Sequence, residues 1–194
     1  MQRAVITLLT LTLSVPVFGA DLGELAVSMI GGSSRGFGSL TPTDWRLHEG
    51  RGAEARLTIF LPGSLSASVD VGKQRIESRA AGVTEASHAV SQAVMLDWYG
   101  GALGRAVPYL GAGVSYLRYG QAHPTAEGQL TQPDHAAFMT EAGVKYLLSP
   151  KWRFNTGVRF GPARSTAEVM HANGTVEHID FHQFYVSAGI GYAF

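Results

Sequence analysis

Apolar and polar residues alternate with a period of two along most of this chain after residue 20. That period is typical of β-strands whose two faces meet different surroundings, because successive side chains of a strand point to opposite faces. In residues 151–160, Trp152 and Phe154 share one face, whereas Arg153 and Arg159 share the other. The 3.6-residue period of amphipathic helices is almost absent, so the pattern predicts an all-β fold.

Eight segments carry this alternation. They are residues 22–31, 53–61, 64–74, 88–99, 107–119, 135–148, 151–162 and 181–194. A tilted β-strand needs about 9–11 residues to cross a membrane, and these segments are long enough to do so.

The connections between the segments alternate in length. Three are short and contain turn residues, around 62–63, 100–104 and 149–150. The other four are longer and polar, and they run through 32–52, 75–87, 120–134 and 163–180. Short turns at one end and long loops at the other are typical of outer-membrane barrels, with the turns in the periplasm. The even number of strands then places both termini in the periplasm.

The two faces of the segments separate charge from apolar surface. One face carries Glu24, Arg56, Asp70, Asp97, Glu141, Lys145, Arg153 and Arg159. The other carries Leu57, Ile59, Val69, Val71, Val94, Leu96, Leu110, Val114, Phe138, Val144, Val158 and Ile190. A soluble calyx has an apolar lumen, whereas a membrane barrel has its apolar face outside. We therefore expect an eight-stranded antiparallel transmembrane β-barrel with the charges inside.

The eight inward charges are the first candidate site. The lumen of an eight-stranded barrel is just wide enough for side chains to fill it. Acids and bases enclosed there are expected to form an ion-pair network, because an unpaired buried charge carries a large desolvation penalty. Within the network we expect Arg159 to pair with Glu141. A gated polar path through the lumen is the alternative.

The N-terminus predicts export. Residues 1–20 contain a basic residue, Arg3, an apolar stretch and then the small residues Gly19 and Ala20, which is the layout of a secretory signal peptide. Cleavage after Gly19 and cleavage after Ala20 both stay open, and a short buried N-terminal helix is the alternative interpretation. We expect the exported barrel domain to span residues 21–194.

The amino-acid composition excludes several other classes of protein. The chain has no cysteine, which excludes disulfide scaffolds and thiolate chemistry. Its 15 basic and 15 acidic residues give no net charge, so no nucleic-acid partner is expected. No stretch after residue 20 is apolar enough for a membrane-spanning helix. The 24 glycines, about 12% of the chain against a usual ~7%, follow no repeat.

Three stretches resemble a known group of proteins. The sequence PYLGAGVSYLRYG at 108–120 follows a segment that ends in aromatic residues, and AGVKYLLSPKWRF at 142–154 and AGIGYAF at 188–194 complete the pattern. Together they resemble the small eight-stranded outer-membrane barrels of the OmpW-like, OmpX-like and opacity-type families of Gram-negative envelopes. The resemblance implies a noncatalytic outer-membrane protein in contact with lipid and lipopolysaccharide. It also implies that the barrel-assembly machinery recognises the last strand, which ends in Phe194.

The resemblance to OmpW-like proteins further implies handling of small hydrophobic molecules at the extracellular mouth or at the lateral wall. The first long loop and its flanks contain four apolar residues that suit such a mouth pocket, namely Phe37, Leu40, Trp45 and Leu47. Packing on neighbouring loops or on lipopolysaccharide would explain these residues equally well. A surface-interaction or envelope-integrity role with a plugged lumen is the alternative function.

Enzymatic chemistry is weakly supported. A lipid A-modifying enzyme needs a serine, a histidine and a carboxylate together. His182, Ser187 and Glu177 are of the right types, but His182 and Ser187 are five residues apart and point to opposite faces of one strand. All seven histidines lie in or beside the long loops. We predict no catalytic residues, no metal ligands and no cofactor.

Overall fold

The computed structural model describes residues 21–37, 46–80, 83–120, 128–131, 134–171 and 174–194, so the predicted signal peptide at 1–20 lies outside the described residues. In this part of the chain the strands are β1 (Gly23–Phe37), β2 (Arg46–Phe60), β3 (Leu65–Ala80), β4 (Val83–Tyr99), β5 (Ala106–Tyr119), β6 (Gly128–Thr131), β7 (His135–Leu147), β8 (Trp152–His171) and β9 (Val176–Ala193). No helix among these residues is long and apolar enough to cross a membrane.

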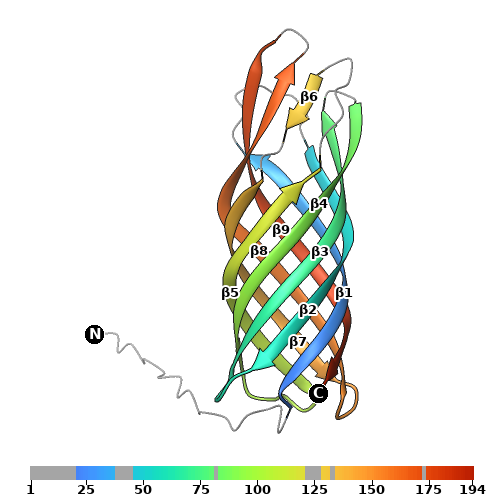
Figure 1. Cartoon of the computed structure of the whole chain (residues 1–194), viewed down its shortest axis with the longest axis vertical. Coiled ribbons are helices and arrows are strands. Elements are labelled where there is room, and N and C mark those ends of the chain that lie inside the picture. The colour runs from blue at the N-terminus through green and yellow to red at the C-terminus, as the bar shows by residue number, and fades with distance from the viewer. Residues whose placement is uncertain (1–20, 38–45, 81–82, 121–127, 132–133, 172–173) are drawn as a thin grey trace, which may run out of the picture.

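Eight of these strands close into one antiparallel barrel (Figure 1). Strand order follows the chain from β1 to β5 and then through β7, β8 and β9, and β9 pairs with both β1 and β8. The short β6 pairs only with the far end of β8, outside this ring. The predicted eight-stranded transmembrane topology is therefore confirmed. Closure pairs each of the eight strands with two neighbours, which is what a strand-built membrane protein requires.

The strands are longer than the sequence pattern predicts, so the expected extents of the long connections at 32–52, 75–87, 120–134 and 163–180 are wrong. β1, β2, β8 and β9 each continue into these ranges, and β6 lies within one of them. β3 and β4 also extend, pairing as far as Ala80 and Val83. Beyond the bilayer both faces of a hairpin meet polar surroundings, so backbone pairing continues there without apolar alternation to reveal it.

The short turns gather at one end of the barrel, where the C-terminus and the start of β1 also lie (Figure 1). Gly63 and Gly104 have φ angles of 82° and 65° in two of these turns. Residues with a Cβ rarely adopt such backbone angles, so glycine permits the tight chain reversals at these two turns.

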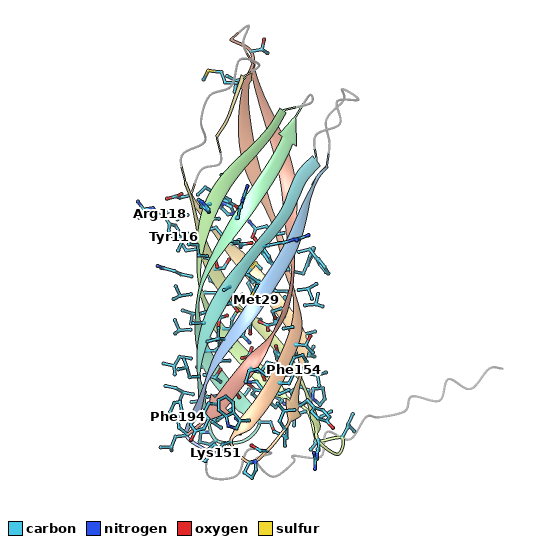
Figure 2. The ribbon with its side chains drawn as sticks, turned by 90° about the vertical axis from the view of Figure 1, so that its right-hand side faces the viewer. Met29, Tyr116, Arg118, Lys151, Phe154 and Phe194 are labelled. Atoms are coloured by element: carbon cyan, nitrogen blue, oxygen red, sulfur yellow. The ribbon has the colours of Figure 1, made fainter. Side chains whose placement is uncertain are left out.

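The outer face is apolar over most of its height (Figure 2). Met29 and Val27 on β1 and Leu96 on β4 all have more than 60% of their surface exposed, which would be unfavourable in water. Near the short-turn end the outward side chains become aromatic, and Trp152 packs edge-on against Tyr192 with ring centroids 5.2 Å apart. Aromatic residues at this level are typical of the membrane–water interface of outer-membrane barrels.

Glycines on the inner face make room for large side chains from neighbouring strands. A Cβ on Gly143 or Gly157 would meet the ring or hydroxyl of Tyr109 at 2.6–2.8 Å, well inside van der Waals contact. A Cβ on Gly191 would likewise collide with the Glu24 carboxylate. The high glycine content thus has a structural use in this narrow lumen.

The closed barrel predicts the circular dichroism spectrum and the gel migration of the refolded protein. Residues 21–194, refolded in detergent, should give a β-rich far-UV circular dichroism spectrum. Unboiled samples should migrate differently from boiled samples on gels, because the closed sheet resists detergent until it is heated. A predominantly helical spectrum would contradict the fold.

Candidate functional site in the barrel lumen

The barrel interior holds all eight charged residues of the predicted lumen set. Seven of them are buried, and the Arg159 side chain is about 11% exposed. They form two clusters along the barrel axis and one separate carboxylate. Each cluster joins strands that are distant in sequence.

The first cluster lies near the start of β1 and is centred on Glu24, which has no exposed surface. Lys145 Nζ on β7 lies 3.0 Å and Arg153 Nη1 on β8 lies 2.9 Å from the same Glu24 oxygen, Oε2. The Asn155 amide donates a hydrogen bond to the other oxygen, Oε1. Arg153 also pairs with Asp21, just before β1. One buried carboxylate is therefore satisfied by three donors from two strands.

Aromatic rings cover the cations of this first cluster. Lys145 Nζ lies 5.7 Å from the centroid of Phe60 and 5.6 Å from that of Tyr99, and the Arg153 guanidinium lies 5.2 Å from the centroid of Phe60. Cations at this distance from a ring face are stabilised by its quadrupole. The rings also keep water away from the ion pairs, which strengthens the attraction between the charges.

The second cluster lies farther along the barrel and joins β2, β3, β7 and β8. Arg56 makes a two-point contact with Asp70, at 2.7 and 3.0 Å, and a second contact with Glu141. Arg159 contacts Glu141 at 3.0 Å, Asp70 at 2.9 Å and Glu54 at 2.8 Å. Two guanidinium groups thus share three carboxylates, and forked Arg–carboxylate pairs of this kind are strong and directional.

Asp97 belongs to neither cluster. Its carboxylate accepts long hydrogen bonds, 3.5 and 3.4 Å, from the hydroxyls of Ser66 and Ser68 on β3. Among the described side chains, no lysine or arginine lies within ion-pair distance of it. Of the eight predicted residues, Asp97 is therefore the one that the structure does not bring into an ion pair.

Besides Asp21, three residues of the clusters were absent from the predicted lumen set. Glu54 lies two residues from Arg56 and shares its face, so the alternation already contained that signal. Asn155 lies on the inward face of β8, between Arg153 and Arg159. Tyr109 donates a hydrogen bond of 2.6 Å to Glu141, and alternation with the outward Leu110 already places its ring on the inner face.

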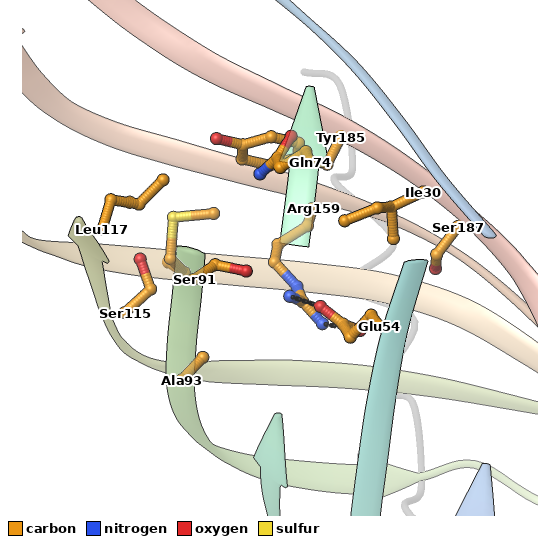
Figure 3. Close-up of a pocket in the computed structure, with 11 residues that line it drawn as sticks. Ile30, Glu54, Gln74, Ser91, Ala93, Ser115, Leu117, Arg159, Tyr185 and Ser187 are labelled. Carbon is orange, nitrogen blue, oxygen red and sulfur yellow. Dashed lines mark hydrogen bonds and ion pairs between the residues drawn. The ribbon is translucent and has the colours of Figure 1, made fainter. Parts of the chain in front are cut away.

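A small cavity remains beyond the second cluster (Figure 3). Its volume is about 20 Å³, and its lining includes Glu54, Arg159, Gln74, Ile30 and Tyr185. A cavity needs at least about 10–15 Å³ to hold one water molecule, so this space accepts little more than that. The described lumen at this level has no room for an organic ligand.

Farther toward the long-loop end, three inward side chains form a polar contact. His135 stacks on Tyr119 with ring centroids 5.7 Å apart, and Gln183 Nε2 lies 3.2 Å from both the Tyr119 hydroxyl and His135 Nε2. His135 thus lies inside the barrel and not in a solvated loop. Within the described residues, no three His, Asp or Glu side chains are grouped to hold a metal ion.

The predicted mouth pocket falls largely outside the described residues. Leu40 and Trp45 are not described, and for Phe37 and Leu47 only the backbone is, at the end of β1 and the beginning of β2. The end of β1 and the beginning of β2 lie at the end of the barrel opposite the short turns.

The wall of the barrel changes near this end. β7 and β8 pair from Leu147↔Arg153 to Thr140↔Phe160 and no farther, although both strands continue. Residues 135–139 of β7 therefore face residues 161–167 of β8 without strand pairing between them, and we call this the β7–β8 seam. On its other side β8 shifts register against β9 between Gly161 and Ser165. Pro162 lies in this stretch and has no N–H to donate to a sheet.

Comparison with known proteins gives one family and several similar folds. The profile of the OmpW family matches residues 58–194. Outer membrane protein OprG from Pseudomonas aeruginosa is 14% identical with a TM-score of 0.66, covering 91% of this chain and 98% of that chain. Outer membrane protein AlkL is 18% identical with a TM-score of 0.67, covering 93% and 94%. Outer Membrane Protein W from E. coli is 20% identical with a TM-score of 0.53, covering 90% and 100%.

At these identities the likeness to solved structures shows the fold alone. A search of curated proteins finds no significant match.

The second cluster predicts strong coupling between Arg159 and Glu141. Arg159→Ala and Glu141→Ala should each destabilise the barrel by about 3–5 kcal/mol, because each leaves a buried charge without its partner. The double variant should lose less than the sum, as expected for one network. Urea unfolding in detergent measures all three.

Lys151→Ala is the matched control, since Lys151 pairs with Asp21 at the exposed end of the barrel. It should change stability by at most about 1 kcal/mol. If Arg159→Ala and Glu141→Ala both left the stability unchanged, the second cluster would have to be solvated, which would contradict a filled lumen.

Proposed function

This chain belongs to the OmpW family of outer-membrane β-barrel proteins, and we propose that it is a noncatalytic barrel that handles small hydrophobic molecules at its extracellular end and passes them through its wall. The observation that carries this proposal is the contrast between a filled lumen and a loosened wall. The two charged clusters block the axis, whereas the β7–β8 seam interrupts the sheet beside it.

The charged clusters act as a plug in this proposal. A hydrophobic molecule moving along the axis would have to separate Arg56 and Arg159 from their carboxylates, and it offers no polar group in return. That cost is several kcal/mol for each stranded charge. The axis is therefore the least favourable route for an apolar solute.

The β7–β8 seam offers a route that avoids the plug. Phe138 on β7 and Phe160 on β8 are both outward and more than 40% exposed, so the outer edges of the seam are apolar. Phe138 is eight residues beyond the interfacial Tyr146, which is about 20 Å along the barrel axis at 3.3 Å per residue and the usual strand tilt. The seam thus lies near the outer boundary of the hydrocarbon, where water and headgroups still satisfy unpaired backbone groups.

The predicted mouth pocket of Phe37, Leu40, Trp45 and Leu47 would receive the solute in this scheme. We also propose that the assembly machinery recognises the last strand, because β9 is followed directly by the exposed Phe194, whose backbone hydrogen-bonds to that of Gly23 where the barrel closes. A surface-interaction or envelope-integrity role is the second candidate, and the plugged lumen favours it over a channel.

Closing the seam tests the proposed route. The chain has no cysteine, so a Phe138→Cys/Pro162→Cys pair can be bridged across the seam with a short bismaleimide. Bridging should remove most of the protein-dependent uptake of a fluorescent medium-chain fatty acid into proteoliposomes, whereas the unbridged variant should retain uptake. Unchanged uptake after complete bridging would contradict a route through the seam.

An Ala142→Cys/Val158→Cys pair is the matched control, because these residues are direct partners on the same two strands below the seam. Bridging it should leave uptake unchanged. Planar-bilayer recordings of the wild-type protein should show no steady conductance, since the plug closes the axis. A silent barrel without any uptake would favour the surface-interaction role.

The mouth pocket makes a separate prediction. Trp45→Ala should weaken binding of an apolar fluorescent probe several-fold while the heat-shifted gel band stays intact. Trp98→Ala is the control, because Trp98 faces outward at the opposite end of the barrel and should leave probe binding unchanged. Equal probe binding by all three proteins would favour packing of the loop aromatics over a pocket.

A further inference from the structure

The outer face of β2–β5 changes from apolar to cationic toward the long-loop end. Five exposed basic side chains gather there, which we call the outer basic cluster: Arg51, Lys73, Arg75, His88 and Arg118. Each lies on the long-loop side of the outward apolar residues of its own strand, as Lys73 does relative to Val69 and Val71. Strand alternation places all five on the outer surface, not in the lumen.

The height of the outer basic cluster matches the edge of the membrane. Arg75, His88 and Arg118 each lie ten residues from an outward side chain at the short-turn end of the same strand. Ten residues rise about 25 Å along the axis at 3.3 Å per residue and the usual tilt, which is the height of the apolar band of such barrels. Figure 2 places Arg118 beyond Met29 and far from Phe194. The cluster therefore lies at the headgroup level of the outer leaflet.

The members of the outer basic cluster are close neighbours. Arg51 on β2 is the direct cross-strand partner of Arg75 on β3, which in turn is the partner of His88 on β4. Lys73 and Arg118 are both partners of Val90. Neighbouring strands are about 4.8 Å apart, so the whole cluster spans roughly 15 Å.

Among the side chains that the structure describes, the outward strand cations lie on one side of the barrel. The outward side chains described for β1, β7, β8 and β9 include no lysine or arginine, and Phe138, Phe160 and Phe184 are among them. Within the described residues, Arg51 and Lys73 have no ion-pair partner. Asp134 approaches Arg118 at 3.9 Å, at the edge of the cluster. The charge is thus concentrated and faces the lipid.

We propose that the outer basic cluster binds the phosphorylated sugar headgroup of the outer-leaflet glycolipid, lipopolysaccharide. Arginine suits phosphate because its planar fork of donors bonds two phosphate oxygens at once. The exposed Gln92 and Tyr116, direct partners on β4 and β5, lie beside the cations. Gln92 supplies hydrogen bonds for sugar hydroxyls, and the Tyr116 hydroxyl, which donates to Asp134, accepts one. This site is separate from the plug and the seam, and it does not depend on the transport proposal.

Binding of purified lipid A to the detergent-solubilised barrel tests the proposal. Native mass spectrometry should detect bound lipid A that carries both phosphates. Arg51→Gln/Lys73→Gln should weaken this binding by at least about tenfold, because each cation near a lipid phosphate contributes to the attraction. Both residues face away from the lumen, so the heat-shifted gel band should persist.

Arg105→Gln/Lys151→Gln is the matched control, since it also removes two exposed cations but at the short-turn end. It should bind lipid A like the wild type. Dephosphorylated lipid A should bind the wild type as weakly as the Arg51→Gln/Lys73→Gln variant binds intact lipid A.

Equal lipid A binding by the Arg51→Gln/Lys73→Gln variant, or by the dephosphorylated lipid, would overturn the proposal. Displacement of lipid A by millimolar inorganic phosphate, or equal affinity for phosphatidylglycerol, would also overturn it. Either result would show a general anion site and not a glycolipid site.

Discussion

The narrow lumen of an eight-stranded barrel is the constraint from which the other features follow. Such a lumen is filled by side chains and leaves no continuous water column. Charged side chains that point inward must therefore find partners inside, and they do so in two clusters around Glu24 and around the pair Arg56 and Arg159. The same lack of space explains why glycines face Tyr109 and Glu24.

Pairing is strict in the middle of the barrel and relaxes toward the long-loop end. Inside the hydrocarbon an unpaired backbone group costs several kcal/mol, so every strand there pairs on both sides. Near the outer boundary that penalty falls, because water and lipid headgroups replace the missing partner. The β7–β8 seam and the register shift beside Pro162 both occur in this zone. The change of solvent along the barrel axis thus coincides with the change from a fully paired wall around the charged clusters to a wall with a gap in its pairing.

Much of the fold could be predicted from the sequence, because each strand has one face toward lipid and one toward the polar lumen, and the two faces need different residues. The alternation in Trp152–Phe160 needs no structure to interpret, and it assigned Arg153 and Arg159 to the lumen. The ion-pair partners were harder to predict, because the register between strands decides whether Arg159 pairs with Glu54 as well as with Glu141. The seam was not predictable, because a loss of pairing leaves no mark on alternation, and Pro162 alone does not say which strand separates. The strand extensions were missed because outside the membrane the two faces no longer differ.

The length of the β8–β9 hairpin has a consequence for the cell surface. β8 has 20 residues, which at 3.3 Å per residue and a tilt near 40° reach about 50 Å along the barrel axis, twice the apolar band. Figure 1 shows this hairpin rising above the rest of the barrel. Its tip at Gly174 therefore extends well beyond the apolar band. The tip is a natural place to insert an epitope tag without changing the membrane-embedded wall.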